Sequence, residues 1–124
     1  MKRIIHTDDA PKAVGPYSQA VEANGTLYIS GQLPIDPATG KTPDTIEEQT
    51  EQALKNVGAI LRAAGYTYAD VVKSTVLLSD MDDFAAMNGV YARFYAQDMP
   101  ARVAYQVAKL PFGVKVEIEM IAAK

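Results

Sequence analysis

The chain has 124 residues, 48% of them hydrophobic and 22% charged, with 12 Lys and Arg against 15 Asp and Glu and a formal net charge of −3. This composition and length are typical of one folded, soluble domain, which we expect to span residues 1–124. The basic residues are scattered, which argues against a nucleic-acid partner. The absence of cysteine excludes disulfides, thiolate nucleophiles and Cys-ligated metal sites.

The N-terminal segment carries charges at Lys2 and Arg3 and again at Asp8 and Asp9. It therefore lacks the apolar centre of a signal peptide. No stretch of the chain approaches the apolar length that spans a bilayer. We expect a cytoplasmic protein that does not associate with membranes.

The first predicted elements are a hairpin and a loop. Asn24 and Gly25 supply the positive φ angles of a two-residue turn, so two short strands are expected within residues 21–29. Residues 34–43 hold three prolines and a glycine, a composition that indicates a surface loop.

A long helix is predicted next. Thr45 and Glu48 have the spacing of a capping box, and apolar residues then recur at helical spacing until Gly65 ends the pattern. Residues 71–78 are rich in β-branched side chains and predict a strand. Residues 81–95 return to helical spacing and predict a second helix.

Two alternating segments, 101–107 and 114–121, predict the last strands, with the connection at residues 109–113. The order of elements favours an α+β fold in which two helices cover one face of one sheet. Alternation places Arg102, Ala104 and Gln106 on one side of their strand, and it turns Glu117 and Glu119 away from the helices. We therefore expect Arg102, Glu117 and Glu119 to share the uncovered face.

Most standard catalytic sets are missing. The single histidine, His6, has no partner motif, and we interpret it as a structural or surface residue. The sequence contains no His-x-x-x-His pair and no acidic residues at ligand spacing, so it predicts no metal site. It also contains no glycine-rich phosphate loop.

Four motifs remain unexplained by fold alone. They are GPYSQA at residues 15–20, YISGQLP at 28–34, PARVAYQVAKLP at 100–111 and EIEMIA at 117–122. Together, and with Ala10-Pro11, they resemble the RidA/YjgF family over essentially the whole chain.

The resemblance implies a chorismate-mutase-like α+β fold, with a single mixed sheet and two helices packed on one face, in a homotrimer with clefts between subunits. It also implies that 2-iminobutanoate and 2-iminopropanoate are the substrates. These reactive products of pyridoxal-phosphate enzymes would be hydrolysed to 2-keto acids and ammonia without a cofactor.

Arg102 is the candidate anchor for the substrate. Its planar, permanently charged fork fits a carboxylate bidentately, an interaction of about 1.5 to 3 kcal/mol when desolvated. Spacing alone equally allows a cross-strand ion pair with Glu117 or Glu119. The resemblance favours ligand binding, because the family uses the matching arginine in this way.

Glu117 is the candidate for handling water. A carboxylate partly screened from solvent has a raised pKa and can orient or deprotonate a water molecule. The alternative is an ordinary solvated glutamate on a strand. The family pattern points to Glu117 rather than to Glu119.

Five other residues are candidates for binding the substrate. Tyr17 could stack on it or bond the imine nitrogen, although a Tyr after proline often only packs at a turn. Ser30 and Gly31 end a strand, where a missing Cβ lets backbone groups approach a ligand. Asn88 is a candidate only because of the family resemblance. Ala104 stands where many bacterial members carry Cys, so a covalent thiol mechanism is impossible, but its backbone carbonyl could still hold water.

The alternative function is a non-enzymatic trimeric module of the same family, which would bind small molecules or act as a regulator or chaperone-like protein. Arg102 discriminates between the two, because a deaminating cleft needs a carboxylate anchor. Ribonuclease action has less support, since the chain lacks a basic groove and a pair of histidines.

Overall fold

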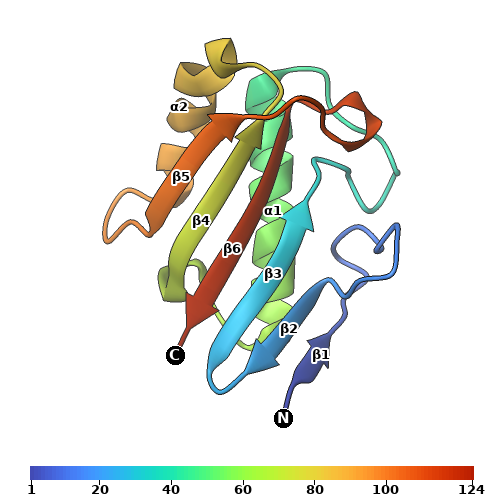
Figure 1. Cartoon of the computed structure of the whole chain (residues 1–124), viewed down its shortest axis with the longest axis vertical. Helices are drawn as coiled ribbons and strands as arrows, with labels where there is room; N and C mark the ends of the chain where they lie inside the picture. The colour runs from blue at the N-terminus through green and yellow to red at the C-terminus, as the bar shows by residue number, and fades with distance from the viewer.

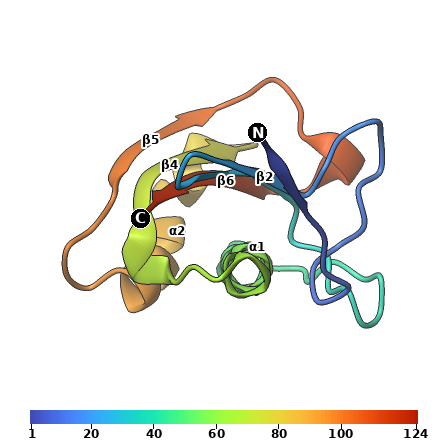
Figure 2. The same cartoon turned by 90° about the horizontal axis from the view of Figure 1, so that it is seen from below.

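The computed structural model describes residues 1–124. Six strands form one sheet in the order β1-β2-β3-β6-β4-β5, in which only β4 and β5 are parallel. Both α-helices lie on the same side of the sheet (Figure 1 and Figure 2). The predicted α+β fold, a single mixed sheet with two helices on one face, is confirmed. The strands are β1 (Arg3–Ile5), β2 (Ala20–Ala23), β3 (Thr26–Gln32), β4 (Val71–Leu78), β5 (Ala101–Gln106) and β6 (Val116–Ala123), and the helices are α1 (Ile46–Ala64) and α2 (Phe84–Phe94).

The predicted hairpin is formed by β2 and β3. Asn24 and Gly25 turn the chain with φ angles of 53° and 77°, the positive values that this short turn requires. β3 continues three residues beyond the predicted end at position 29, as far as Gln32. The pairing of β3 with β6 shifts register between Ile29 and Gln32, so a β-bulge falls within the YISGQLP motif.

α1 has the predicted ends. The Thr45 side chain accepts a hydrogen bond from the Glu48 backbone N–H at 3.1 Å, and Gly65 ends the helix in the left-handed conformation with φ 84°. The apolar stripe packs under the centre of the sheet, against β3 and β6. Neither α-helix combines the length and apolar character needed to cross a bilayer.

Polar side chains of α1 hold the loops at one end of the sheet. Asn56, only 1% exposed, donates hydrogen bonds of 2.9 Å to the carbonyls of Leu33 and Ile35. Gln49 accepts one from the Lys115 N–H at 2.8 Å. This bond helps to explain why β6 begins at Val116, two residues later than predicted, since the N–H of residue 115 is used by the helix.

The second predicted helix, residues 81–95, is divided in two. A 3-10 turn, η2 (Met81–Asp83), precedes α2, and the Asp80 carboxylate accepts from the Asp82 N–H at 2.8 Å. α2 connects the parallel strands β4 and β5 and lies beneath them, beside α1 (Figure 2). The edge of the sheet formed by β4 and β5 is therefore covered only by the short helix α2.

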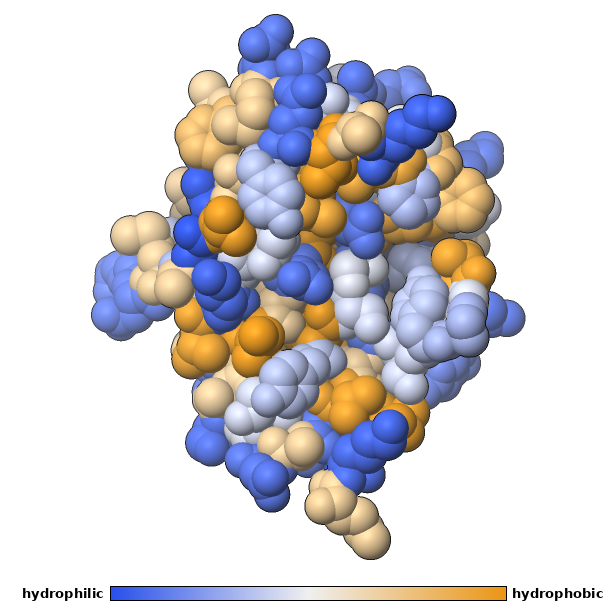
Figure 3. All heavy atoms as spheres, in the orientation of Figure 1, coloured by the Kyte–Doolittle hydropathy of each residue, from blue (hydrophilic) through white to orange (hydrophobic).

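The two faces of β6 are as predicted. Val116, Ile118 and Met120 are buried under the helices. Glu117 and Glu119 point to the open face, which carries a mixture of polar and apolar side chains (Figure 3).

β5 corrects the prediction that Arg102 shares this open face. Arg102 pairs with Ser74, a residue that is fully buried on the helix side, whereas Tyr105 pairs with Leu77, which also pairs with Glu117. Because paired residues point to the same face, Arg102 lies on the helix side and Glu117 on the open side.

The position of β5 at the edge of the sheet explains the error. Val103 and Tyr105 face the open side and are 41% and 47% exposed, although an apolar pair would normally mark the covered side. On the helix side, Arg102 lies over aromatic rings of α2. An edge strand can expose its apolar side in one chain, so alternation alone does not identify its covered face.

Candidate functional site

The structure gathers four of the predicted site residues into one pocket of about 400 Å³ on the open face. The pocket lies where β3 ends and β6 begins, beside the 3-10 turn η3 (Pro111–Gly113). Its walls include Tyr17, Ser30, Gly31 and Glu117, with Glu119 beside them. We name it the Glu117 pocket.

Gly31 makes room for the Glu117 carboxylate. A Cβ at position 31 would overlap Glu117 Oε2 and would lie only 3.0 Å from its Cδ. Sequence reasoning expected this open space to serve the approach of a ligand to the backbone, whereas in the structure a catalytic candidate occupies it. The β-bulge and the glycine thus set the position of the carboxylate.

Ser30 ties the preceding loop to the sheet. Its hydroxyl donates to the Ser18 carbonyl at 2.6 Å, and its backbone N–H donates to the Gln19 carbonyl at 2.9 Å. These bonds hold the loop that carries Tyr17. The Tyr17 hydroxyl accepts from the Val14 N–H at 3.2 Å and keeps its own hydrogen for another acceptor.

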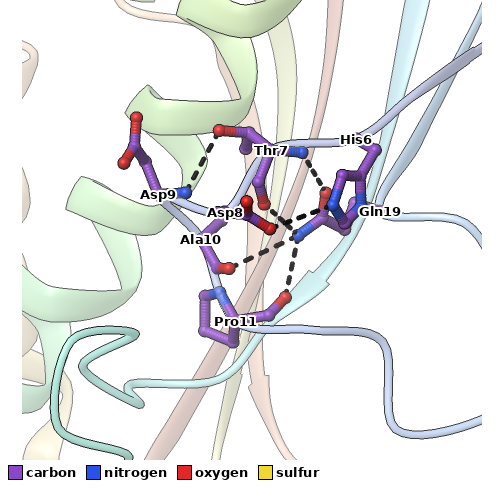
Figure 4. A network of polar contacts seen from close by, with 7 residues as sticks. All are labelled: His6, Thr7, Asp8, Asp9, Ala10, Pro11 and Gln19. Atoms are coloured by element: carbon purple, nitrogen blue, oxygen red, sulfur yellow. Dashed lines mark hydrogen bonds and ion pairs between the residues drawn. The ribbon is translucent and has the colours of Figure 1, made fainter.

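Gln19 anchors the same loop from the other side (Figure 4). Its buried side-chain amide donates to the carbonyls of Thr7 at 3.0 Å and Pro11 at 2.9 Å, and its Oε1 accepts from the Thr7 N–H at 2.8 Å. Gln19 belongs to the GPYSQA motif, but the sequence alone predicted no role for it. The available signal was an amide side chain one residue before an apolar strand.

The Glu117 carboxyl has no cationic partner within the chain. Partial burial raises its pKa above the usual range, and the negative charge of Glu119 raises it further. No cation of the same chain forms an ion pair with it. A carboxylate with a raised pKa is suited to accept a proton from water.

The other two predicted polar residues, Arg102 and Asn88, line a second pocket of about 290 Å³ on the helix side. Met99 and Pro100 complete its rim beside α2. We name it the Arg102 pocket. Ala104 follows on the same face of β5, where it packs against the core, and it provides no side-chain chemistry.

Arg102 has no acidic partner in the chain. The ion pairs of the structure are elsewhere, so the alternative of a cross-strand pair with Glu117 or Glu119 is wrong. Its Cζ lies instead 4.8 Å from the ring centroid of Tyr91 and 5.7 Å from that of Phe84. A charged fork without a carboxylate partner keeps its N–H donors free for an anion.

The aromatic residues of α2 that contact Arg102 were not predicted from the sequence. Phe84, Asn88 and Tyr91 have the i, i+4, i+7 spacing of one helix face, which was visible in the sequence. That spacing indicates ordinary core packing equally well. Only the position of β5 shows that this face meets Arg102.

His6 lies outside both pockets. Its ring is exposed, and its Nε2 is 3.2 Å from the Asp8 carboxylate, in agreement with a surface role. No group of three or more His, Cys, Asp or Glu side chains is placed to hold a metal ion.

Residues 7–124 match the Endoribonuclease L-PSP family. A 2-iminobutanoate/2-iminopropanoate deaminase from Capra hircus is 54% identical over 125 residues, which cover 100% of this chain and 91% of the relative. The chain belongs to the RidA/YjgF family.

Solved structures place this RidA/YjgF member among close neighbours. A putative endoribonuclease from Thermotoga maritima has a TM-score of 0.97 and 52% identity, with 100% of this chain and 98% of that chain covered. TdcF from E. coli, solved with bound serine, has a TM-score of 0.95 and 43% identity over 98% of each chain. The family motifs are divided in space. GPYSQA, YISGQLP and EIEMIA line the Glu117 pocket, whereas PARVAYQVAKLP supplies Pro100 and Arg102 to the Arg102 pocket and Pro111 to the Glu117 pocket.

Proposed function

We propose that the protein is a cytoplasmic 2-iminobutanoate/2-iminopropanoate deaminase that acts as a homotrimer. The observation that carries this proposal is the separation of its two charged groups. Arg102 lies on the helix side of the sheet and Glu117 on the open side, so one small molecule cannot contact both groups of one chain. A complete site requires the Arg102 pocket of one subunit to meet the Glu117 pocket of its neighbour.

The roles follow from charge and geometry. Arg102 binds the substrate carboxylate through two N–H donors and thereby places the imine carbon near Glu117. Glu117 accepts a proton from water as the water oxygen bonds to the imine carbon. The electron pair of the C=N bond moves to nitrogen, which takes up a proton from solvent.

The hydroxyl of this tetrahedral intermediate then gives its proton to solvent as the C=O bond forms and the C–N bond breaks, so that ammonia leaves. Glu117 returns its proton to the departing nitrogen. The sum is an imino acid plus water giving a 2-keto acid plus ammonia. Only protons and water are exchanged and no electrons are transferred to an acceptor, so the reaction requires no cofactor.

The relatives support this proposal. Proteins about half identical to this chain are named 2-iminobutanoate/2-iminopropanoate deaminase, from goat and from human. The E. coli relative was solved with serine, which carries the same α-carboxylate as an imino acid. Cleavage of RNA, the activity in the family name Endoribonuclease L-PSP, has no counterpart in the two pockets, since the single histidine lies outside them.

The direct test couples the protein to threonine dehydratase in the presence of semicarbazide, which traps the imine. The wild type should compete for the imine and reduce semicarbazone formation. Arg102→Ala should lose this effect, whereas Arg93→Ala, which removes an exposed arginine of α2 outside the pocket, should retain it. No competition by the wild type would contradict the enzymatic proposal and favour the non-enzymatic binding module.

A further inference from the structure

The guanidinium of Arg102 rests on aromatic rings that belong to another element. Tyr91 and Phe84 project from α2 toward β5, with their ring centroids 4.8 and 5.7 Å from Arg102 Cζ. Tyr91 is only 6% exposed, so its ring is fixed by the core. The arginine is therefore supported on one side by a rigid surface.

Such a surface changes what an arginine can do. An arginine on an edge strand samples many rotamers, and the side-chain entropy lost when one rotamer is fixed opposes ligand binding. A ring face attracts the cation while leaving the N–H edge of the planar fork free for a carboxylate. Support of this kind sets the plane of the fork before the ligand arrives.

The Tyr91 hydroxyl does not explain why a tyrosine occupies this position. It is buried and has no well-formed hydrogen bond, and the same is true of the hydroxyl of Ser74, which pairs with Arg102 across the strands. Burial raises the pKa of Tyr91, so the ring stays neutral. The Tyr91 hydroxyl is directed to the buried Ser74 hydroxyl, whereas its ring is the part of the side chain that meets the Arg102 cation.

We propose that Phe84 and Tyr91 are positioning residues that hold the Arg102 guanidinium in the orientation that receives the substrate carboxylate. This inference deepens the proposed function and rests on it, because the carboxylate is that of the imino acid. It assigns to α2 a role in substrate binding beyond covering the sheet.

The test measures binding and turnover separately. Calorimetry gives the Kd for 2-oxobutanoate, a stable carboxylate of the same skeleton, and the coupled assay gives KM and kcat for 2-iminobutanoate. Tyr91→Leu should raise both Kd and KM about 5- to 10-fold, the size of a partly desolvated cation–π contact, with kcat changed less than about 2-fold. Phe84→Leu should raise them by a smaller factor, about 2- to 3-fold, because its ring is farther from the cation.

Two variants separate the ring from other effects. Tyr91→Phe keeps the ring and should bind 2-oxobutanoate like the wild type. Phe94→Leu removes a ring of α2 that packs on Tyr68 instead of Arg102, and it should also leave Kd unchanged. Equal Kd values for Tyr91→Leu and Phe94→Leu would overturn the proposal, and so would a Tyr91→Phe variant as weak as Tyr91→Leu.

Failure of the enzymatic proposal gives a different result. A wild type that binds 2-oxobutanoate but turns over no imine would refute the deaminase, while the Kd series would still decide the role of the rings. No binding of 2-oxobutanoate by a folded wild type would overturn the positioning role itself. If Tyr91→Leu does not fold, Phe84→Leu decides, and an unchanged Kd for that variant would overturn the proposal.

Discussion

Arg102 and Glu117 lie on opposite faces of one sheet, with β4 between their strands. The proposed site can therefore be completed only by two chains, each of which supplies a different pocket. Such a contact joins unlike surfaces and closes into a ring when its rotation permits, as in the proposed trimer.

Mixing two inactive variants should restore activity. Arg102→Ala and Glu117→Gln chains, unfolded together and refolded in equal amounts, form hybrid rings. About one junction in four then pairs an intact Arg102 with an intact Glu117, so about a quarter of wild-type activity should return.

The refolded single variants serve as controls and should stay inactive. A mixture that also stays inactive, with hybrid oligomers verified by mass spectrometry of differently tagged chains, would show that the two residues do not act across an interface.

Gly31→Ala should damage catalysis more than stability. The added Cβ displaces the Glu117 carboxylate, which lies at the movable end of its side chain. Because the displaced carboxylate no longer lies in its reacting position, kcat should fall about 10- to 100-fold, with a small change in melting temperature.

Gly89→Ala is the matched control, since a Cβ at that exposed position of α2 meets no atom within 4 Å. It should keep full activity and gain stability of about 0.5 to 1 kcal/mol in thermal unfolding. Normal kcat in Gly31→Ala would contradict the placement of Glu117 as the group that handles water.

Glu119→Gln should shift the pH profile. The negative charge of Glu119 helps to raise the pKa of Glu117, so its removal lowers that pKa. Glu117 must be ionised to accept a proton, and the acid limb of kcat against pH should therefore move to lower pH. An acid limb that stays in place would argue that another group sets it.

Gln19→Leu should unfold at a lower temperature than the wild type. The substitution leaves the Thr7 N–H and the carbonyls of Thr7 and Pro11 without their partner, at a cost of about 2 to 4 kcal/mol. Gln97→Leu, at an exposed position after α2, should change the melting temperature little. Equal melting temperatures for the two variants would contradict the anchoring role of Gln19.

Much of the fold could be predicted because it depends on local signals. The turn at Asn24 and Gly25 and the ends of α1 at Thr45 and Gly65 follow from backbone preferences that act over a few residues. Alternation correctly buried Val116, Ile118 and Met120 as well, because β6 is a central strand with helices on one side only. The family followed from four motifs in order.

The position of β5 was decided by tertiary structure alone. Alternation says which residues share a side of a strand, but at the edge of a sheet it does not say which side is covered. The pairing of Arg102 with Ser74, and the two rings that α2 places beneath it, settle that question. The sequence by itself therefore determined the family and named Arg102 and Glu117 as candidates, and only long-range packing decided that one chain holds these two residues in separate pockets.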